Sequence, residues 1–280
     1  MPKPAGNRIR SAQLEWAKAS QVALDKDGYC LELNANLFQP LSACSRRDFE
    51  AGDGAELGKI GARGKLQAVH SSSALACNAF DFWRGRDLEL VGAALDLPER
   101  PCSMRLEAQF KTPLRGTPPN LDVAFEGVAG TTSAIECKFT EPYAKSKSKN
   151  LLKDKYFPSG DGLWAQHGLR AAQGIADALR AGSMHFTFLD GAQLLKHCLG
   201  LAYSTGKWTL TYLWYDVGGD EGDGHRLEAA RFIEALKADK AGVTALSYQE
   251  FFSRLIPTLP ASAAGYRQYL EGRYFPHRLG

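Results

Sequence analysis

The spacing of apolar residues changes near Met104, from intervals of three and four residues to strict alternation. The first kind of spacing is typical of a helix with one buried face, and the second of a strand with one buried face. Within the first part, glycine and charged residues crowd the segment 46–64 and predict an exposed connection. Helices are expected there at 13–24, capped by Ser11, at 65–83 and at 86–95.

The second part of the chain mixes alternating segments with helical ones. The segments 121–126 and 134–139 alternate and are joined by a turn rich in glycine and threonine, so they predict a β-hairpin. A basic loop follows the hairpin, and Asp190 is suited to cap a later helix. Further strands are expected at 104–110, 208–217 and 243–248, helices at 162–179, 191–202, 226–238 and 249–270, and a turn at 218–224.

This order of elements predicts an α/β or α+β fold, in which a mixed central sheet is flanked by helices. We expect residues 1–100 to form a helical N-terminal region that packs on, or leads into, a core at 101–280. A chain of 280 residues is long enough for both parts to share one integrated domain.

Alternation also predicts where the charged side chains of the hairpin point. Asp122, Glu136 and Lys138 occupy positions between apolar residues, so they emerge on one face if the apolar faces share the core. By the same logic Glu107, on the preceding strand, lies opposite the apolar side chains of that strand. The expected apolar face consists of Leu106, Ala108, Phe110, Leu121, Val123, Phe125, Ile135, Cys137 and Phe139.

Carboxylates and a lysine on adjacent strands suit the hydrolysis of phosphodiesters. Mg²⁺ is held in proteins by one or two carboxylates together with water and phosphate oxygens, and Mn²⁺ is an alternative. A lysine two residues beyond the second carboxylate faces the same side, where it can orient the attacking water or neutralise charge on the phosphate. The competing interpretation is a solvated polar face on an antiparallel hairpin.

The segment Pro119-Asn120-Leu121-Asp122, followed fourteen residues after Asp122 by Glu136-Cys137-Lys138, resembles the PD-(D/E)XK nuclease superfamily. The amino-acid sequence of these motifs is most similar to an uncharacterised restriction-endonuclease branch of that superfamily. The resemblance implies a restriction endonuclease-like fold, with Asp122 and Glu136 as metal ligands and Lys138 as the catalytic lysine. It makes Glu107 the counterpart of the upstream glutamate, although that glutamate usually lies on a helix.

Three further residues are accessory candidates. Glu141 follows the second hairpin strand, where it can reach the metal or a lysine, or be plain surface. Gln193 and His197 share one face of the helix that begins after Asp190. Some relatives, notably RecB-type nucleases, place a glutamine and an aromatic residue four positions apart beside the site. A buried polar helix face is the alternative for this pair.

A basic stretch follows the hairpin directly and predicts contacts with nucleic-acid phosphates, unless it is a solvated loop. It contains Lys145, Lys147, Lys149, Lys153 and Lys155. A second polar group, of Ser71, Ser72, Ser73 and Asn78, either lines the groove of the site or serves in capping and buried hydrogen bonds.

Composition and charge narrow the class of protein only a little. The net charge of +3 permits a polyanionic partner without requiring one. No apolar run reaches the roughly 18 residues of a membrane span, and the polar N-terminus does not resemble a secretory signal. The six cysteines are scattered without a C-x-x-C pair, which favours reduced thiols and a cytoplasmic location.

The hypothesis that accounts for most of these features is a metal-dependent DNA endonuclease with a restriction or defence role. A homodimer would suit the cutting of both strands at a palindrome. One alternative is a nucleic-acid-binding protein on a nuclease fold without independent cleavage. Another is a small-molecule enzyme or interaction domain whose hairpin carries the motif by chance.

Overall fold

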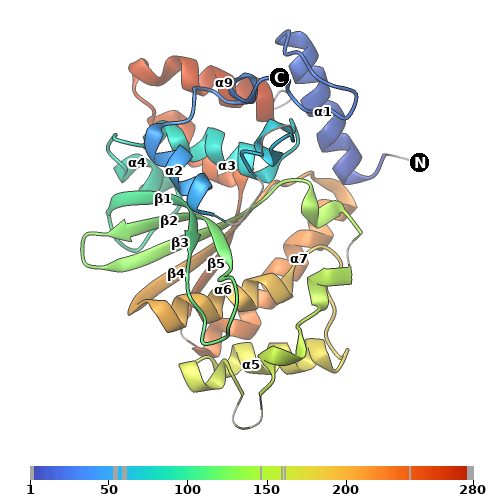
Figure 1. Ribbon diagram of the computed structural model, residues 1–280, viewed down its shortest axis with the longest axis vertical. Coiled ribbons are helices and arrows are strands. Elements are labelled where there is room, and N and C mark those ends of the chain that lie inside the picture. The colour runs from blue at the N-terminus through green and yellow to red at the C-terminus, as the bar shows by residue number, and fades with distance from the viewer. Residues whose placement is uncertain are drawn as a thin grey trace.

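A five-stranded sheet forms the centre of the protein, in the order β1-β2-β3-β4-β5 (Figure 1). The computed structural model describes residues 3–52, 56–58, 62–145, 147–158, 160, 162–239 and 241–275, without the side chains of residues 147 and 148. The pairs β1–β2 and β2–β3 are antiparallel, whereas β3–β4 and β4–β5 are parallel. The strands are β1 Pro101–Gln109, β2 Asn120–Gly127, β3 Thr131–Lys138, β4 Lys207–Trp214 and β5 Gly242–Ser247.

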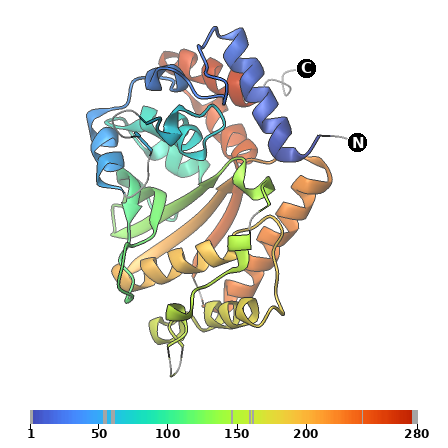
Figure 2. The same cartoon turned by 45° about the vertical axis from the view of Figure 1, so that its right-hand side comes forward.

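Helices cover both faces of this sheet and create two separate cores (Figures 1 and 2). One core packs helices from the two ends of the chain against one face, and the other packs the helices between β3 and β5 against the opposite face. The first layer contains α1 Ala5–Ala19, α2 Ala43–Ala51, α3 Ser72–Phe80, α4 Glu89–Ala94, α8 Tyr248–Leu255 and α9 Ala264–Tyr274. The second contains α5 Arg170–Arg180, α6 Gly191–Ser204 and α7 Gly219–Leu236. The expected mixed sheet flanked by helices is therefore confirmed.

The hairpin, the strands and the cap at Asp190 lie close to their predicted positions. Asp190 Oδ1 accepts a hydrogen bond of 2.8 Å from the backbone N–H of Gln193 at the start of α6. The predicted helix at 65–83 is instead broken, because Ser71 caps a new helix in its middle.

Several other predictions of local structure were wrong. Helix α2 extends to Ala51, into the connection expected at 46–64, and the helix expected at 162–179 begins only at Arg170. Ser11 lies inside α1, which begins six residues earlier at Ala5, and the N–H of Ala5 donates to Glu221. The turn expected at 218–224 forms the first turns of α7, although it contains glycines. Acidic residues in the first turn of α7 stabilise its N-terminus through the helix dipole, and this offsets part of the low helix propensity of its glycines.

The faces of β1 and β2 switch near Glu107, contrary to the regular alternation that was predicted. Glu107 has a φ of 48°, and the register pairs Leu106 with Val123 and Ala108 with Leu121 while skipping the pair between them. Leu106 and Val123 pack in the first core, whereas Ala108, Phe110 and Leu121 pack in the second. A residue with positive φ reorients the strand after it, so the alternation does not continue through Glu107.

The two ends of the chain are joined by a buried arginine in the first layer. Arg273 of α9 is 1% exposed, and its guanidinium donates to Gln13 of α1, to both oxygens of Asn36 and to the carbonyl of Val69. It also donates to the Tyr269 hydroxyl, so all three of its nitrogens are hydrogen-bonded. Helices from opposite ends of the sequence thus form one layer.

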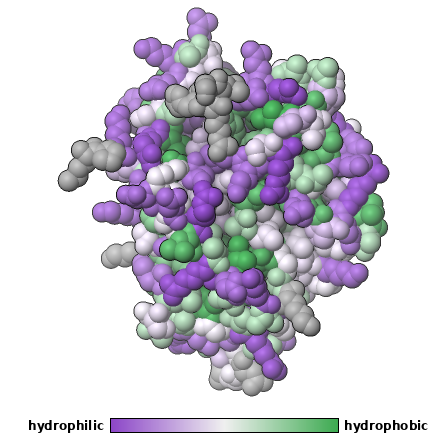
Figure 3. Space-filling view, turned by 180° about the vertical axis from the view of Figure 1, so that it is seen from behind, coloured by the Kyte–Doolittle hydropathy of each residue, from purple (hydrophilic) through white to green (hydrophobic). Residues whose placement is uncertain are grey.

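Hydrophilic side chains dominate the surface seen from behind, with apolar ones in smaller areas between them (Figure 3). Within the part of the chain that the structure describes, no helix combines the length and the apolarity needed to cross a membrane.

Candidate active site

A cavity of about 1150 Å³ opens between the two helical layers, beside the end of β3 and the start of β2. Its walls come from strands, from the N-terminus of α3, from α6 and from the basic stretch after β3. Most of the residues that the sequence singled out line it together. They are Glu107, Asp122, Glu136, Lys138, Glu141, Lys153, Lys155, Gln193 and His197.

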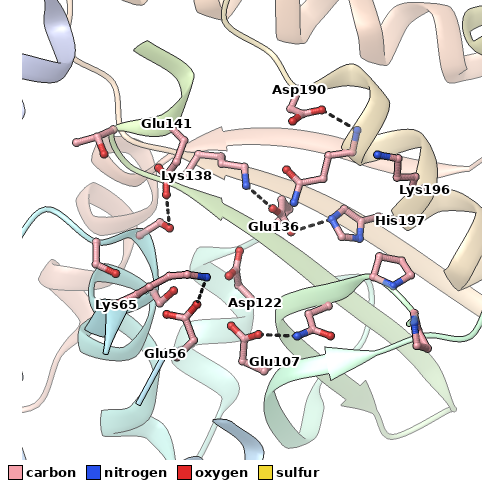
Figure 4. A pocket seen from close by; sticks show the side chains of 18 of the residues that line it. Glu56, Lys65, Glu107, Asp122, Glu136, Lys138, Glu141, Asp190, Lys196 and His197 are labelled. Carbon is pink, nitrogen blue, oxygen red and sulfur yellow. Dashed lines mark hydrogen bonds and ion pairs between the residues drawn. The ribbon is translucent and has the colours of Figure 1, made fainter. Parts of the chain in front are cut away.

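Glu136 and Lys138 form a buried charged pair in the cavity. The Nζ atom of Lys138 lies 2.5 Å from Oε1 of Glu136, and Glu136 is 2% exposed (Figure 4). Burial by itself would raise the pKa of Glu136, but Lys138 and His197 outweigh burial and lower this pKa to about 2. Burial would lower the pKa of Lys138, but Glu136 and Asp122 outweigh it and raise this pKa above its usual value.

The second oxygen of Glu136 faces His197. Nε2 of this histidine lies 3.0 Å from Oε2 of Glu136, but the geometry between them is not that of a hydrogen bond. His197 is 1% exposed and is carried by α6, which packs on the sheet. Oε2 of Glu136 is therefore a buried acceptor that makes no hydrogen bond within the described residues.

Asp122 points into the same cavity from β2 (Figure 4). Its Oδ2 atom accepts a hydrogen bond of 2.6 Å from the backbone N–H of Cys137, which ties the carboxylate to β3. Burial, together with the negative charge of Glu136, raises the pKa of Asp122 well above its usual value. The raised pKa means that the ionised form of Asp122 is disfavoured beside Glu136. A cation that binds between the two carboxylates would stabilise this ionised form.

Glu107 lies further along the cavity, where its Oε2 atom accepts a hydrogen bond of 2.9 Å from Asn120. Burial and the nearby carboxylates of Glu56 and Glu136 raise its pKa to about 7. Glu107 is the residue with positive φ at which β1 switches faces, and its side chain lines the cavity.

The donor set fits a hard divalent cation. Asp122 and Glu136 line one cavity, and Glu136 retains a buried oxygen without a hydrogen bond. Across the described ranges, no group of three or more His, Cys, Asp or Glu side chains is arranged to hold a metal ion. Two carboxylates, completed by water and phosphate oxygens, are nevertheless the ordinary protein contribution to a Mg²⁺ site.

Glu141 is fixed between β3 and α3. Its Oε1 atom accepts a hydrogen bond of 2.5 Å from the hydroxyl of Ser72, and Oε2 accepts one of 3.0 Å from the N–H of Phe139. Ser71, Ser72 and Ser73 line the cavity, with Ser71 as the cap of α3. Asn78 instead serves the core, because its amide bonds Phe38, Asn36 and Tyr274.

The basic stretch divides into residues that reach the cavity and residues that do not. Lys153 and Lys155 are exposed and line the cavity, whereas Lys145 is exposed outside it. Lys149 is 4% exposed, and its ammonium donates to the carbonyls of Pro142, Ala144 and Thr187. This burial is at odds with the phosphate contact expected of Lys149. The side chain of Lys147 lies outside the described residues.

Several residues of the cavity were not singled out from the sequence. Glu56 and Lys65 form an ion pair of 2.9 Å opposite the hairpin, and Glu56 has a second buried oxygen without a partner among the described residues. Lys196 of α6 lies beside the ring of Tyr156, close to Lys155. Glu56 follows a glycine-rich segment without periodicity, so only its charge could have marked it. Lys196 lies between Gln193 and His197, so the helical spacing that marked those two residues also applied to Lys196.

The sheet, its two helical layers and the carboxylate–lysine cavity define a protein with a restriction endonuclease-like fold. Residues 10–275 match the REase-ARP family, described as "Restriction Endonuclease associating with ARP", and the chain belongs to this family. Neither the curated proteins nor the solved structures contain a match to the chain. The restriction endonuclease-like resemblance expected from the hairpin motifs is thus confirmed.

Proposed function

We propose that the chain is a divalent-metal-dependent nuclease that cuts phosphodiester bonds of DNA, in a restriction or defence role. The observation that carries the proposal is the convergence of Asp122, Glu136 and Lys138 in one cavity of a chain from a restriction-endonuclease family. The description of that family also names an association with ARP, and we extend this association to the chain as part of the proposal.

The residues of the chain would have distinct tasks in hydrolysis. Asp122 and Glu136 would hold Mg²⁺ or Mn²⁺, and the bound cation would supply an acidified water and offset charge on the phosphate. Lys138, whose Nζ atom lies beside Glu136, would donate to the attacking water or to a phosphate oxygen. His197 would orient Glu136 from the side of α6.

The polarity of the cavity supports a polyanionic substrate. Lys153, Lys155 and Lys196 line one side of it, and a lysine that meets a phosphate contributes affinity without reading sequence. Asp122 and Glu136 lie on the strands, where bound cations would offset their charge. A homodimer, which would cut both strands at once, belongs to the same proposal.

Cleavage assays with supercoiled plasmid and with linear DNA and RNA, each in Mg²⁺, Mn²⁺ or EDTA, test the function. We expect Lys138→Ala and Glu136→Gln to lower the cleavage rate at least about 100-fold, the usual effect of removing one transition-state donor or metal ligand. Glu126→Gln is a matched control, since Glu126 lies on β2 but lines no part of this cavity and pairs with Arg105.

Circular dichroism and thermal melting must show that each variant is folded. Cleavage that persists in both site variants would refute the assignment of Glu136 and Lys138. Salt-sensitive binding of DNA without cleavage in any metal would support a binding protein on a nuclease fold instead.

A further inference from the structure

The N-terminus of α3 opens into the cavity with two backbone donors unused. Ser71 caps the helix, since its hydroxyl accepts from the N–H of Ala74 at 3.3 Å and its carbonyl accepts from Leu75 at 3.1 Å. The N–H groups of Ser72 and Ser73 make no hydrogen bond within the described chain. Such free N–H groups carry the positive end of the helix dipole and form a ready site for an anion.

The hydroxyl of a mostly buried serine points to the same ligand. Ser73 is 8% exposed and lines the cavity, and its hydroxyl makes no hydrogen bond to any residue that the structure describes. This hydroxyl is open to the cavity, so a ligand there with strong acceptor oxygens can accept its hydrogen bond. The hydroxyl and the two N–H groups are adjacent, so one ligand can meet all three.

A carboxylate of the chain already occupies part of this position. Glu141, at the end of β3, accepts the hydroxyl hydrogen of Ser72, and Figure 4 shows its side chain between β3 and α3. The first turn of α3 contains no acidic residue of its own. A negative group at a helix N-terminus is favourable, so Glu141 provides from outside the helix the charge that the helix lacks.

We propose that the N-terminus of α3 binds a phosphate group of the substrate other than the one that is cut, and that Glu141 occupies this position until the phosphate enters. The inference rests on the proposed nuclease function and names a second contact of the same site. A phosphate has several acceptor oxygens, which match the N–H groups of Ser72 and Ser73 and the hydroxyl of Ser73. The phosphate can belong to the interior of the strand or to its 5′ end.

Proline at residue 72 removes the backbone N–H, together with the hydroxyl that bonds Glu141, with little disturbance to the helix. Ser72 is the first residue of α3, a position that favours proline. Ser71 has φ −74° and ψ 134°, a conformation that suits the residue before a proline. Ala43→Pro is a matched control, because Ala43 is the exposed first residue of α2, follows the cap Ser42 and lies outside the cavity.

Fluorescence anisotropy in EDTA, with a labelled DNA strand, measures binding without cleavage. We expect Ser72→Pro and Ser73→Ala each to weaken binding about tenfold, as expected when a charge-assisted hydrogen bond is lost. Glu141→Gln removes the competing charge, so it should tighten binding about tenfold, and Ser72→Pro should abolish that gain. Ala43→Pro should bind as the unchanged chain does.

Strands with a neutral methylphosphonate at single positions, and strands with a 5′-phosphate or a 5′-hydroxyl, identify the phosphate. An internal contact predicts one methylphosphonate position that weakens binding to the unchanged chain but not to Ser72→Pro. A terminal contact predicts instead a preference for the 5′-phosphate that Ser72→Pro loses.

Two results would overturn the inference in distinguishable ways. Equal binding by the unchanged chain, Ser72→Pro and Ser73→Ala would refute the α3 site while leaving the nuclease function intact. Failure of the unchanged chain both to bind and to cut nucleic acid would refute the proposed function and the α3 site together.

Discussion

Arg273 and Glu136 are both charged and almost completely buried, but their surroundings differ. The guanidinium of Arg273 is surrounded by neutral acceptors from Gln13, Asn36 and Val69, each within hydrogen-bond distance. Glu136 bonds Lys138 with one oxygen, while its other oxygen lies near His197 without a hydrogen bond. Full satisfaction is typical of a structural charge, whereas an unsatisfied buried acceptor suits a site that awaits a ligand.

Arg273→Lys should therefore destabilise the fold, although the positive charge is retained. A lysine has three donors and no planar fork, so several carbonyl and amide oxygens around residue 273 would lose their partners. We expect the free energy of unfolding to fall by about 3 kcal/mol, the scale of buried polar groups left unsatisfied. Urea denaturation measures this change. Arg105→Lys, at an exposed pair with Glu126, should change stability by less than about 1 kcal/mol.

At the scale of elements, one buried lysine fixes the segment that follows β3 to the rest of the protein. Lys149 bonds the carbonyls of Pro142 and Ala144 on its own side and of Thr187 across from it. Asn150 adds a reciprocal pair with the backbone of Phe186. These bonds fix the base of the segment, while Lys153 and Lys155 further along remain exposed at the cavity.

Lys149→Met should loosen this segment without unfolding the sheet. Three carbonyls would lose their donor, so backbone amides of residues 141–157 should exchange with deuterium about tenfold faster or more, in line with a local loss of about 1.4 kcal/mol. Hydrogen–deuterium exchange with peptide mapping measures this effect. Lys145→Met, at an exposed lysine, is the control. Unchanged exchange in Lys149→Met would show that the ammonium does not hold the segment.

The sequence predicted elements best where one face of an element is buried throughout. β3 satisfied this condition around Glu136, because Ile135 and Cys137 both pack in the first core, whereas Asp122 lies between Leu121 of the second core and Val123 of the first. Alternation failed at Glu107, where a backbone with positive φ moves Ala108 to the other core. Such a backbone angle depends on tertiary packing and has no signature in a single sequence.

Residues that reach the site from irregular segments were the least predictable. Glu56 enters the cavity by tertiary packing and ion pairing with Lys65, and neither depends on local spacing. Lys149 illustrates the opposite error, since a lysine in a basic stretch suggests solvent exposure, whereas the fold uses it to bond carbonyls. Charge could be counted from the sequence, but burial could not.

At the scale of the whole molecule, the second core contains a buried neutral histidine. His225 of α7 is 0% exposed, lies 4.2 Å from the ring of Trp214, and its Nε2 atom is 2.9 Å from the Tyr212 hydroxyl. Burial, with a smaller effect of Lys149, lowers the pKa of His225 to about 3. The stability of the protein therefore depends on pH through this residue.

Acid should destabilise the protein through His225. The unfolded chain binds a proton near pH 6.5, while the folded chain keeps this ring neutral down to about pH 3. Stability should thus fall by about 1.4 kcal/mol per pH unit as the pH drops from 6.5 towards 3. Urea denaturation at pH 7.5 and pH 5 measures the fall, which should be smaller in His225→Gln.

The comparison with His225→Gln is needed because Glu107 acts in the opposite direction. Its pKa is raised to about 7, so the folded chain binds more protons than the unfolded chain between about pH 4.3 and 7, and acid stabilises the fold there. An identical pH dependence in His225→Gln and the unchanged chain would contradict the role of His225.

The buried arginine has a consequence for the order in which the chain is made. A ribosome releases residue 13 long before residue 273, but hydrogen bonds to both residues hold together the layer that carries α3. While synthesis continues, the wall of the cavity formed by α3 lacks α9, against which this layer packs. We therefore expect a nascent chain, or one shortened before α9, to lack a formed cavity, so that the proposed nuclease activity would arise only after α9 has been made.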